Sequence, residues 1–383
     1  MTAEMHIVGL GLDHRTAGTP FREQVAAAWE REAADGGVAL CTCLRLEAYL
    51  VADDPARCAA AVAGSVSARA GLQPADVAVR LAVRSGRGAV NHLFSVAAGL
   101  ESMIVGERQI LGQLRDAWGR AREAEPLDPR LDRLFQHAVA AGKRVRRDTG
   151  LGRGARSVGD AAADVLARNA LELGDAAVAI IGAGSVARAT AISLGRRGVR
   201  RFAVVNRSLD RGARLAADLE RHGSRCEALP WERLTQAAAA ADLIVCATSA
   251  PGYVLRPGDL PGGPRRVVAD LALPRDADPG VAAVPGVTLI DLDAVWSHAA
   301  GSVRSTPVDV ADARAIVAGR VDAYMRWMAE REAAPAIEDL MRRMRRPGAT
   351  PDARRALHER TMALKRRARE LTGPRMELDA AHR

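Results

Sequence analysis

Aromatic residues are scarce in this chain of 383 residues, at 3% of the composition. This scarcity argues against a protein that binds nucleic acid mainly by stacking bases on aromatic side chains, whereas recognition by shape and charge stays open. The five cysteines are odd in number and irregularly spaced, so we expect reduced thiols and no disulfide framework. No uncharged run reaches the about 18–20 residues of a membrane span, and the N-terminus lacks the basic segment of a signal peptide. We therefore expect a cytoplasmic protein.

The charge balance of the chain is basic, with 55 Lys and Arg against 46 Asp and Glu and a net charge of +9. Such a balance suits a polyanionic partner such as RNA or a phosphorylated cofactor, although many basic proteins bind no nucleic acid. A hydrophobic content of 48% is typical of a globular protein. Because a single core stops growing at roughly 250–300 residues, we expect two or three domains.

The N-terminal part of the chain predicts an α+β domain, which we assign to residues 1–155. Strands and helices follow one another in the order βαββαβ, the order of a ferredoxin-like fold. Helical periodicity then continues without further strands, and these helices complete the domain. The predicted strands are 6–12, 38–42, 47–52 and 77–83, and the predicted helices are 21–34, 55–70, 89–124 and 131–147.

Residues 156–304 predict a Rossmann-like domain. The Gly- and Arg-rich stretch 150–154 marks the boundary, with a linker near Arg156. Alternation of strands and helices after it indicates a doubly wound parallel sheet. We expect strands at 177–181, 201–206, 242–247 and 267–271, and helices at 158–173, 186–197 and 209–221. The remainder, 305–383, contains only helical patterns, including 308–331, and too little apolar content for its own core, which predicts a helical dimerisation domain.

A glycine motif follows the first strand of the Rossmann-like domain and opens the next helix. The pattern GxGxxA lets the backbone approach a pyrophosphate at the helix N-terminus, whereas the alternative is a plain tight turn. After the next strand, no acidic residue is present to hold a ribose hydroxyl, and a cation with hydrogen-bonding neighbours favours NADP over NAD. The alternative is that this arginine merely caps its loop. The expected cofactor residues are Gly182, Ala183, Gly184, Ser185, Val186, Ala187, Asn206, Arg207 and Ser208.

Cys43 is the candidate nucleophile, because it lies between two predicted strands with Arg45 two residues away. A neighbouring positive charge stabilises a thiolate. The alternatives are an inert buried thiol and, with Cys41, a metal or disulfide pair, for which no second ligand cluster is present. His14 and His92 can move a proton near pH 7, although a histidine at a helix start is more often structural.

Together these motifs resemble those of the glutamyl-tRNA reductase family, over most of the chain. Residues 9–17 resemble the family's opening strand, and 92–113 resemble its most distinctive segment. Residues 41–47, Cys-Thr-Cys-Leu-Arg-Leu-Glu, are similar to its nucleophile motif, usually Ser-Thr-Cys-Asn-Arg-x-Glu. Segments 134–136, 143–146, 206–208 and 270–276 also fit, in the expected order. Cys41, Leu44 and Arg108 stand where the family usually has serine, asparagine and proline.

The resemblance implies the first step of tetrapyrrole (5-aminolevulinate) biosynthesis. The Cys43 thiolate would attack the ester of glutamyl-tRNA and leave a thioester, which NADPH would reduce to release glutamate-1-semialdehyde. His92 would protonate the leaving ribose oxygen, and Arg45 would pair with the substrate carboxylate. No metal is implied, and the partners would be a second copy of the chain and glutamate-1-semialdehyde aminomutase, which would receive the product. The other implied substrate contacts are Thr42, Ser102, Glu107, Gln109 and Gln113.

Two alternatives from other classes stay open at this point. Cys41 and Leu44 would also fit a degenerate paralogue that acts as a tRNA-binding or regulatory dimer without turnover. An unrelated NADP-dependent oxidoreductase of a small carbonyl substrate is the other alternative. Because Cys43, Arg45 and His92 are all present, we expect a working reductase in which Leu44→Asn raises turnover or leaves it unchanged.

Overall fold

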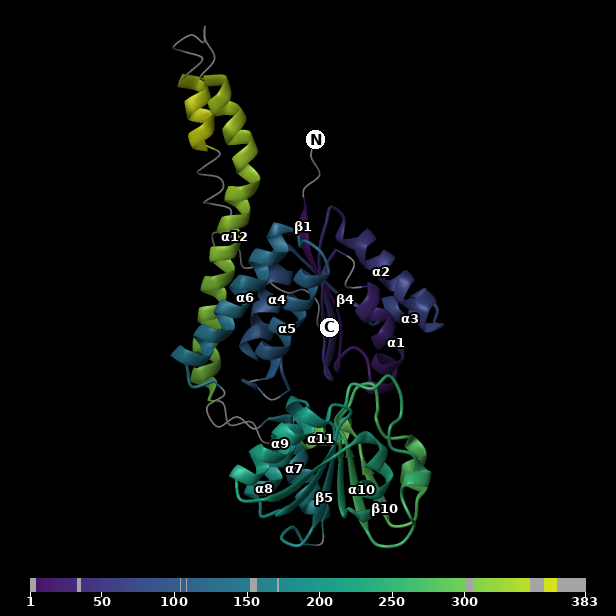
Figure 1. The fold of residues 1–383 in the computed structure, drawn as a ribbon. Helices are drawn as coiled ribbons and strands as arrows, with labels where there is room; N and C mark the ends of the chain where they lie inside the picture. The colour runs from purple at the N-terminus through teal and green to yellow at the C-terminus, as the bar shows by residue number, and fades with distance from the viewer. Residues whose placement is uncertain are drawn as a thin grey trace.

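The computed structural model describes residues 5–32, 36–103, 105–107, 109–151, 157–170, 172–300, 306–344 and 355–363. Two sheets form the centres of two domains, and the long helix α12 (Pro307–Met344) lies along the first domain and extends beyond it (Figure 1). Within the described residues, no helix is both long and apolar enough to cross a membrane. The expected domain boundaries after residues 155 and 304 fall outside the described part of the chain.

The first domain, called here the four-stranded domain, has the expected ferredoxin-like sheet. Neighbouring strands are antiparallel in the order β2-β3-β1-β4. The expected strand 77–83 is wrong for most of its length, because Pro74 and the Gln73–Asp76 capping box begin a short helix and the strand starts only at Ala82. The elements are β1 (His6–Asp13), α1 (Thr19–Glu32), β2 (Val38–Cys41), β3 (Arg45–Ala52), α2 (Pro55–Ala70), α3 (Pro74–Ala78) and β4 (Ala82–Ser85).

Three further helices complete this domain: α4 (Gly86–Ala98), α5 (Gln109–Ala124) and α6 (Pro129–Asp148). The expected single helix 89–124 is interrupted, because Gly99 adopts a φ of 78° and ends α4. A side chain at Gly99 would also lie only 3.1 Å from the Cα of Gly106. After this break, the Gly106 N–H donates to the carbonyl of Gly99 at 2.9 Å, and the carbonyl of Glu101 accepts from Arg45 of β3.

Helix α12 has apolar partners within the same chain. Its buried face, which includes Val317, Val321 and Tyr324, joins the hydrophobic core formed by α4, α5 and α6. Tyr324 also donates a hydrogen bond to the carbonyl of Arg130 in α6, at 3.0 Å. The helical tail, which was expected to have too little apolar content for its own core, thus packs part of its length into the core of the four-stranded domain. The helix also continues through Pro335 instead of ending before it.

The second domain, called here the six-stranded domain, is a doubly wound parallel sheet, as expected. Its strand order is β10-β9-β8-β5-β6-β7. Two strands were missing from the sequence-based prediction, β7 and β10, which are the short edges of the sheet. The strands are β5 (Ala177–Ile181), β6 (Arg201–Val205), β7 (Arg225–Leu229), β8 (Leu243–Cys246), β9 (Arg266–Asp270) and β10 (Val287–Ile290).

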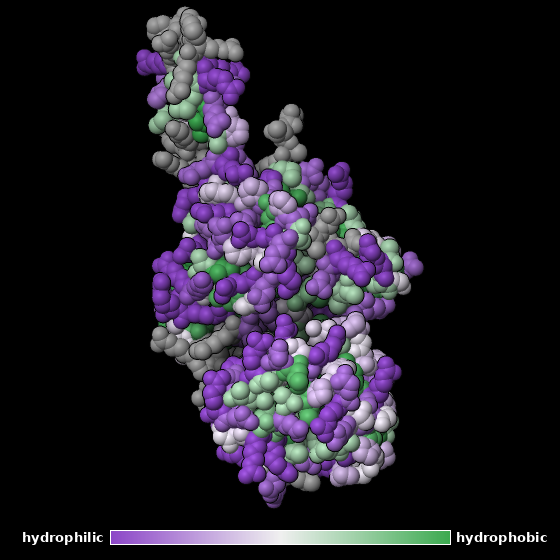
Figure 2. Space-filling view, viewed as in Figure 1, coloured by the Kyte–Doolittle hydropathy of each residue, from purple (hydrophilic) through white to green (hydrophobic). Residues whose placement is uncertain are grey.

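Helices cover both faces of this sheet. On one face, apolar residues of α7 (Val158–Asn169), α8 (Ser185–Arg196), α9 (Leu209–Arg221) and α11 (Leu292–Ala300) share one hydrophobic cluster with the strands. On the other face, α10 (Leu234–Ala240) contributes to a second cluster. The strand order reverses between β5 and β8, and ligands of such folds bind at the carboxyl ends of strands at this reversal. Figure 2 shows hydrophilic side chains over most of the visible face of both domains.

Candidate active site

A cavity of about 580 Å³ lies where the sheet order reverses and is lined by both domains. Loops that follow β5, β6, β8 and β9 form most of its wall, and Trp231, two residues after β7, adds an aromatic ring. The four-stranded domain contributes Cys43 and Gln113. Cys43 and the glycine motif therefore face one and the same cavity, although they are far apart in sequence.

The glycine turn after β5 fits a pyrophosphate. Gly182 has a φ of 107°, and a Cβ there would lie 2.5 Å from the carbonyl oxygen of Ala247. Only glycine is compatible with that approach. Gly184 is the N-cap of α8, so the free N–H groups of the first helical turn are directed toward the cavity. Ser185 and Val186 also line the cavity, as expected, whereas Ala187 is fully buried in the helix.

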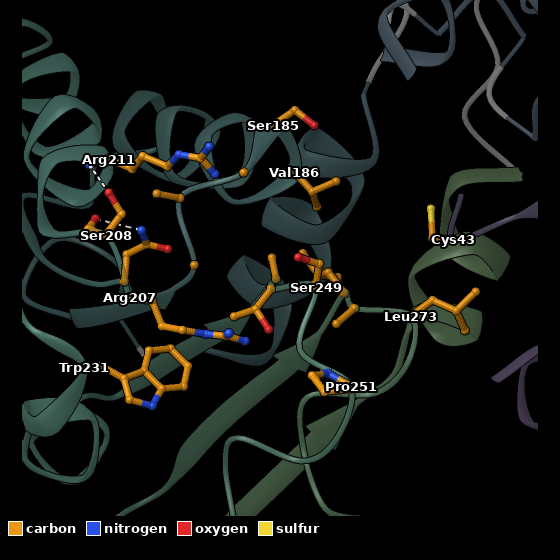
Figure 3. Close-up of a pocket in the computed structure, with 18 of the residues that line it drawn as sticks. Cys43, Ser185, Val186, Arg207, Ser208, Arg211, Trp231, Ser249, Pro251 and Leu273 are labelled. Atoms are coloured by element: carbon orange, nitrogen blue, oxygen red, sulfur yellow. Dashed lines mark hydrogen bonds between the residues drawn. The ribbon is translucent and has the colours of Figure 1, made fainter. Parts of the chain in front are cut away.

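A cationic group occupies one end of the cavity (Figure 3). The guanidinium of Arg207 lies over the ring of Trp231, 5.8 Å from its centroid. The side chain of Asn206 donates to the carbonyl of Ser208 at 2.8 Å, which fixes the turn, and the Ser208 hydroxyl caps α9 at the N–H of Arg211. Among the described residues that line the cavity there is no Asp or Glu.

Trp231 and Arg211 belong to this end of the cavity but were missing from the sequence-based prediction. Arg211 lies four residues after Arg207, in the first turn of α9. This spacing indicated that the two arginine side chains can lie close together. Trp231 follows an edge strand that the sequence pattern did not reveal.

Cys43 lies beside Leu273, at the end of the cavity opposite Arg207 and Trp231 (Figure 3). It stands in the tight loop between β2 and β3. The Thr42 N–H donates to the carbonyl of Arg45 at 2.8 Å, and the Thr42 hydroxyl accepts from the N–H groups of Leu44 and Arg45 at 3.3 Å each. Thr42 therefore shapes the loop that carries Cys43.

The surroundings of Cys43 favour the neutral thiol over the thiolate. Burial raises its pKa to about 12, and the negative charge of Glu107 adds to the increase. Arg22 and Arg45 lower the pKa but do not offset the burial. Arg22 also donates to the carbonyl of Cys43, at 3.3 Å. The expected influence of Arg45 thus has the right direction, but it does not by itself produce a thiolate.

Arg45 and His92 both face Glu47, in a buried network beneath the loop. Glu47 accepts from Arg45 at 3.0 Å and from the Tyr49 hydroxyl at 2.8 Å, and Nε2 of His92 lies 2.8 Å from it. Burial raises the pKa of Glu47, but the charges of His92 and Arg45 outweigh it and hold this pKa well below its usual range. Arg45 also donates to the carbonyl of Glu101. The roles expected for Arg45 and His92 toward the substrate stay predictions.

Several polar atoms around Cys43 are buried without a hydrogen-bond partner in the described part of the chain. They include Oε2 of Glu107, the hydroxyl of Ser102 and Nδ1 of His14. Burial raises the pKa of Glu107 to about 7, against the lowering effect of Arg45 and Arg146. Buried polar atoms are normally paired, so these atoms fit a polar ligand. Gln109 begins α5 but does not line the cavity, and Arg108 lies outside the described residues.

Fold and cavity define a class: a nicotinamide-dependent oxidoreductase in which a cysteine from a second domain faces the dinucleotide site. Residues 10–149 match the family model described as the N-terminal domain of glutamyl-tRNA(Glu) reductase, and residues 165–297 match shikimate/quinate 5-dehydrogenase. A glutamyl-tRNA reductase of Thermus thermophilus is 36% identical over 383 residues, covering 95% of this chain and 94% of the relative. The chain belongs to the glutamyl-tRNA reductase family.

Two further relatives carry the same name. The glutamyl-tRNA reductase of Sorangium cellulosum is 36% identical over 375 residues, which cover 88% of this chain and 70% of the relative. The solved structure of glutamyl-tRNA reductase from Methanopyrus kandleri is 27% identical, with 96% of this chain and 98% of that chain covered and a TM-score of 0.47.

Proposed function

We propose that this chain performs the glutamyl-tRNA reductase reaction through a thioester on Cys43, with NADPH as reductant. The reaction is that of the family: glutamyl-tRNA is reduced to glutamate-1-semialdehyde, in the first step of tetrapyrrole biosynthesis. One observation carries the proposal, namely that Cys43 lines the same cavity as the Gly182 turn.

The residues of the cavity fit a nicotinamide dinucleotide, and they favour its 2′-phosphorylated form. Gly182 and the N-terminus of α8 would hold the pyrophosphate. Arg207 and Arg211 provide two cations at the end distant from Cys43, with no carboxylate of the described lining to repel a phosphate. The nicotinamide end then lies toward Cys43 and Leu273. When bound, the cofactor supplies the hydride for the reduction.

Glu107 is proposed to hold the α-ammonium group of the substrate. This ammonium is bonded to the carbon next to the ester carbonyl, so it arrives near Cys43 together with the reacting carbon. Oε2 of Glu107 is buried and has no hydrogen-bond partner among the described residues. Pairing with the ammonium would also neutralise the charge that raises the pKa of Cys43. Binding of the correct substrate would thereby favour the thiolate.

In the acylation step, the thiol proton of Cys43 passes to solvent water, from which His92 regains the proton that it donates, and the sulfur forms a bond to the ester carbonyl carbon. The bond to the ribose oxygen breaks, and the free tRNA leaves with a proton that His92 is proposed to donate. Glu47 would hold the His92 ring for this transfer. Arg45 is proposed to exchange the carbonyl of Glu101 for the side-chain carboxylate of the substrate.

Assembly is the remaining part of the proposal. The C-terminal part of α12 projects past the four-stranded domain (Figure 1). Apolar side chains lie among hydrophilic ones there (Figure 2), and Met341 of this helix is exposed. We propose that this segment pairs two copies of the chain, within a domain division of 1–155, 156–304 and 305–383. Because an aldehyde with a neighbouring amine is reactive, direct transfer of the product to glutamate-1-semialdehyde aminomutase is also proposed.

Substitution of each cysteine of the 41–43 motif tests the function. Cys41 is partly buried at the end of β2 and does not line the cavity, so Cys41→Ser is a matched control for Cys43→Ser. NADPH oxidation with glutamyl-tRNA, and label transfer from ¹⁴C-labelled glutamyl-tRNA to the protein, should both vanish in Cys43→Ser and persist in Cys41→Ser. The reverse pattern would overturn the assignment of Cys43 as the nucleophile. Oxidation of NADPH with free glutamate would overturn the assignment of glutamyl-tRNA as the substrate.

A further inference from the structure

Leu44, the residue next to Cys43, is buried in the core of the other domain. Its exposed fraction is 3%, and it belongs to the apolar cluster that α7, α8, α9 and α11 form on the sheet of the six-stranded domain. Among the described buried residues of that cluster, Leu44 is the one that comes from the four-stranded domain. Cys43 and Met103 pack against the same cluster as partly buried neighbours. The loop that carries the nucleophile is therefore joined to the dinucleotide-binding domain by an apolar contact.

Polar contacts reinforce the junction on the side of α1. The Thr19 hydroxyl donates to Asp293 of α11 at 2.6 Å, and Glu23 accepts from the N–H of Arg275 at 2.9 Å. Arg22, between them, donates both to the Thr19 hydroxyl and to the carbonyl of Cys43. These contacts hold α1 against the six-stranded domain, and Arg22 links α1 to the Cys43 loop. Leu44 is the side chain of that loop that is buried in the core of the six-stranded domain.

We propose that Leu44 is a positioning residue, which holds the Cys43 loop against the six-stranded domain so that the acylated sulfur stays at the hydride-donor end of the cavity. The inference rests on the proposed function. Leu44 does not line the cavity, so it acts through Cys43. An asparagine at this position would bury an amide in an apolar cluster, which is unfavourable unless the amide finds hydrogen-bond partners.

Leu44 should affect the two chemical steps, acylation of Cys43 and reduction of the thioester, to different extents. Acylation of Cys43 depends on groups of the four-stranded domain, including Glu107 and His92. It does not require the two domains to be held in a fixed relative position. Reduction requires the thioester and the cofactor site to be held together, and a misplacement of about 1 Å between reacting groups can lower a rate by roughly 10²-fold. Loss of Leu44 should therefore impair reduction and spare acylation. A thioester that is not reduced is hydrolysed by water, and this hydrolysis releases glutamate and regenerates the thiol.

The partition of the thioester is the measurement that tests this role. Leu44→Asn and the apolar control Leu44→Met would be acylated with ¹⁴C-labelled glutamyl-tRNA, then mixed with NADPH, and the ratio of semialdehyde to free glutamate would be determined. We expect Leu44→Asn to acylate within about twofold of the natural chain but to shift the ratio toward glutamate at least roughly tenfold. Leu44→Met should keep both values. This outcome reverses the sequence-based expectation for Leu44→Asn.

Two results would overturn the proposal. One is a Leu44→Asn chain with an unchanged ratio, whether its acylation is normal or slow, because a purely structural defect lowers both steps together. The other is faster reduction in Leu44→Asn than in the natural chain. If Leu44→Asn does not fold, Leu44→Ala replaces it with the same expected shift in the ratio. Failure of the natural chain to form a labelled Cys43 would instead refute the proposed function, so the two failures are distinguishable.

Discussion

Replacement of Glu107 by glutamine should stabilise the protein at alkaline pH and leave its stability almost unchanged at acidic pH. The side chain is 7% exposed, and burial raises its pKa from 4.5 to about 7. Between these two values the folded chain holds a proton that the unfolded chain releases. The stability that protonated Glu107 contributes is complete below about pH 4.5 and is lost as the pH rises through 7.

The gain in unfolding free energy expected for Glu107→Gln follows from the raised pKa of Glu107. The increase from 4.5 to about 7, at about 1.4 kcal/mol for each pKa unit, corresponds to roughly 3 kcal/mol. Glutamine preserves the shape of the side chain and cannot ionise. The variant should match the natural chain near pH 4.5 and exceed it by up to about 3 kcal/mol at pH 8. Burial also raises the pKa of Asp270 to about 7. Because Asp270 is present in both chains, its contribution to the pH dependence cancels in the difference between their unfolding free energies.

Urea denaturation followed by circular dichroism at pH 5 and pH 8 provides the measurement. A difference in unfolding free energy between the two chains that does not change with pH would refute the reasoning, because it would mean that Glu107 has the same pKa in the folded and the unfolded chain. Activity provides a separate check. If Glu107 pairs with the α-ammonium group, Glu107→Gln should raise KM for glutamyl-tRNA at pH 8, although it makes the protein more stable.

Three further predictions concern single side chains. Arg207→Asp should weaken NADPH binding far more than NADH binding in fluorescence titrations, and equal affinity of the natural chain for both cofactors would contradict it. Glu47→Gln should lower the unfolding free energy by about 3 kcal/mol, because Arg45 is left buried without its charge partner; an unchanged urea midpoint would contradict it. Gly182→Ala should abolish NADPH binding, since the new Cβ would meet the carbonyl of Ala247; unchanged affinity would show that the turn can shift.

Much of the fold could be predicted where its signals are local. The helix Pro55–Ala70 has its cap at Asp54 and ends at Gly71, both visible in the sequence, and its predicted bounds agree with the structure. The sequence signals for the strand β5 and for the turn at Gly182 are equally local. The edge strands β7 and β10 were missed because they have only 5 and 4 residues, so that the alternation of more and less exposed residues in each is too short to stand out.

The site was only partly predictable, because most of its geometry depends on contacts distant in sequence. The glycine turn was predicted from its motif between a strand and a helix, and Cys43 from its position two residues before Arg45 together with the family resemblance. The sequence did not reveal that His92, 45 residues from Glu47, turns its ring toward that carboxylate. Nor could composition reveal the partners of α12, since the apolar face with Val317 and Tyr324 is matched by α4 and α6, more than a hundred residues earlier.

The departures from the family motif concern packing more than chemistry. Cys41 packs against the core of the four-stranded domain, and burial raises its pKa to about 12, so it remains a small apolar thiol where serine is usual. Leu44 is buried in the apolar cluster of the six-stranded domain. The groups proposed for the chemistry are Cys43, which lies in the loop between these two positions, together with Glu107 and His92. Because both departures add apolar contacts and remove none of these groups, the motif does not require the degenerate paralogue, and membership of the reductase family excludes an unrelated oxidoreductase.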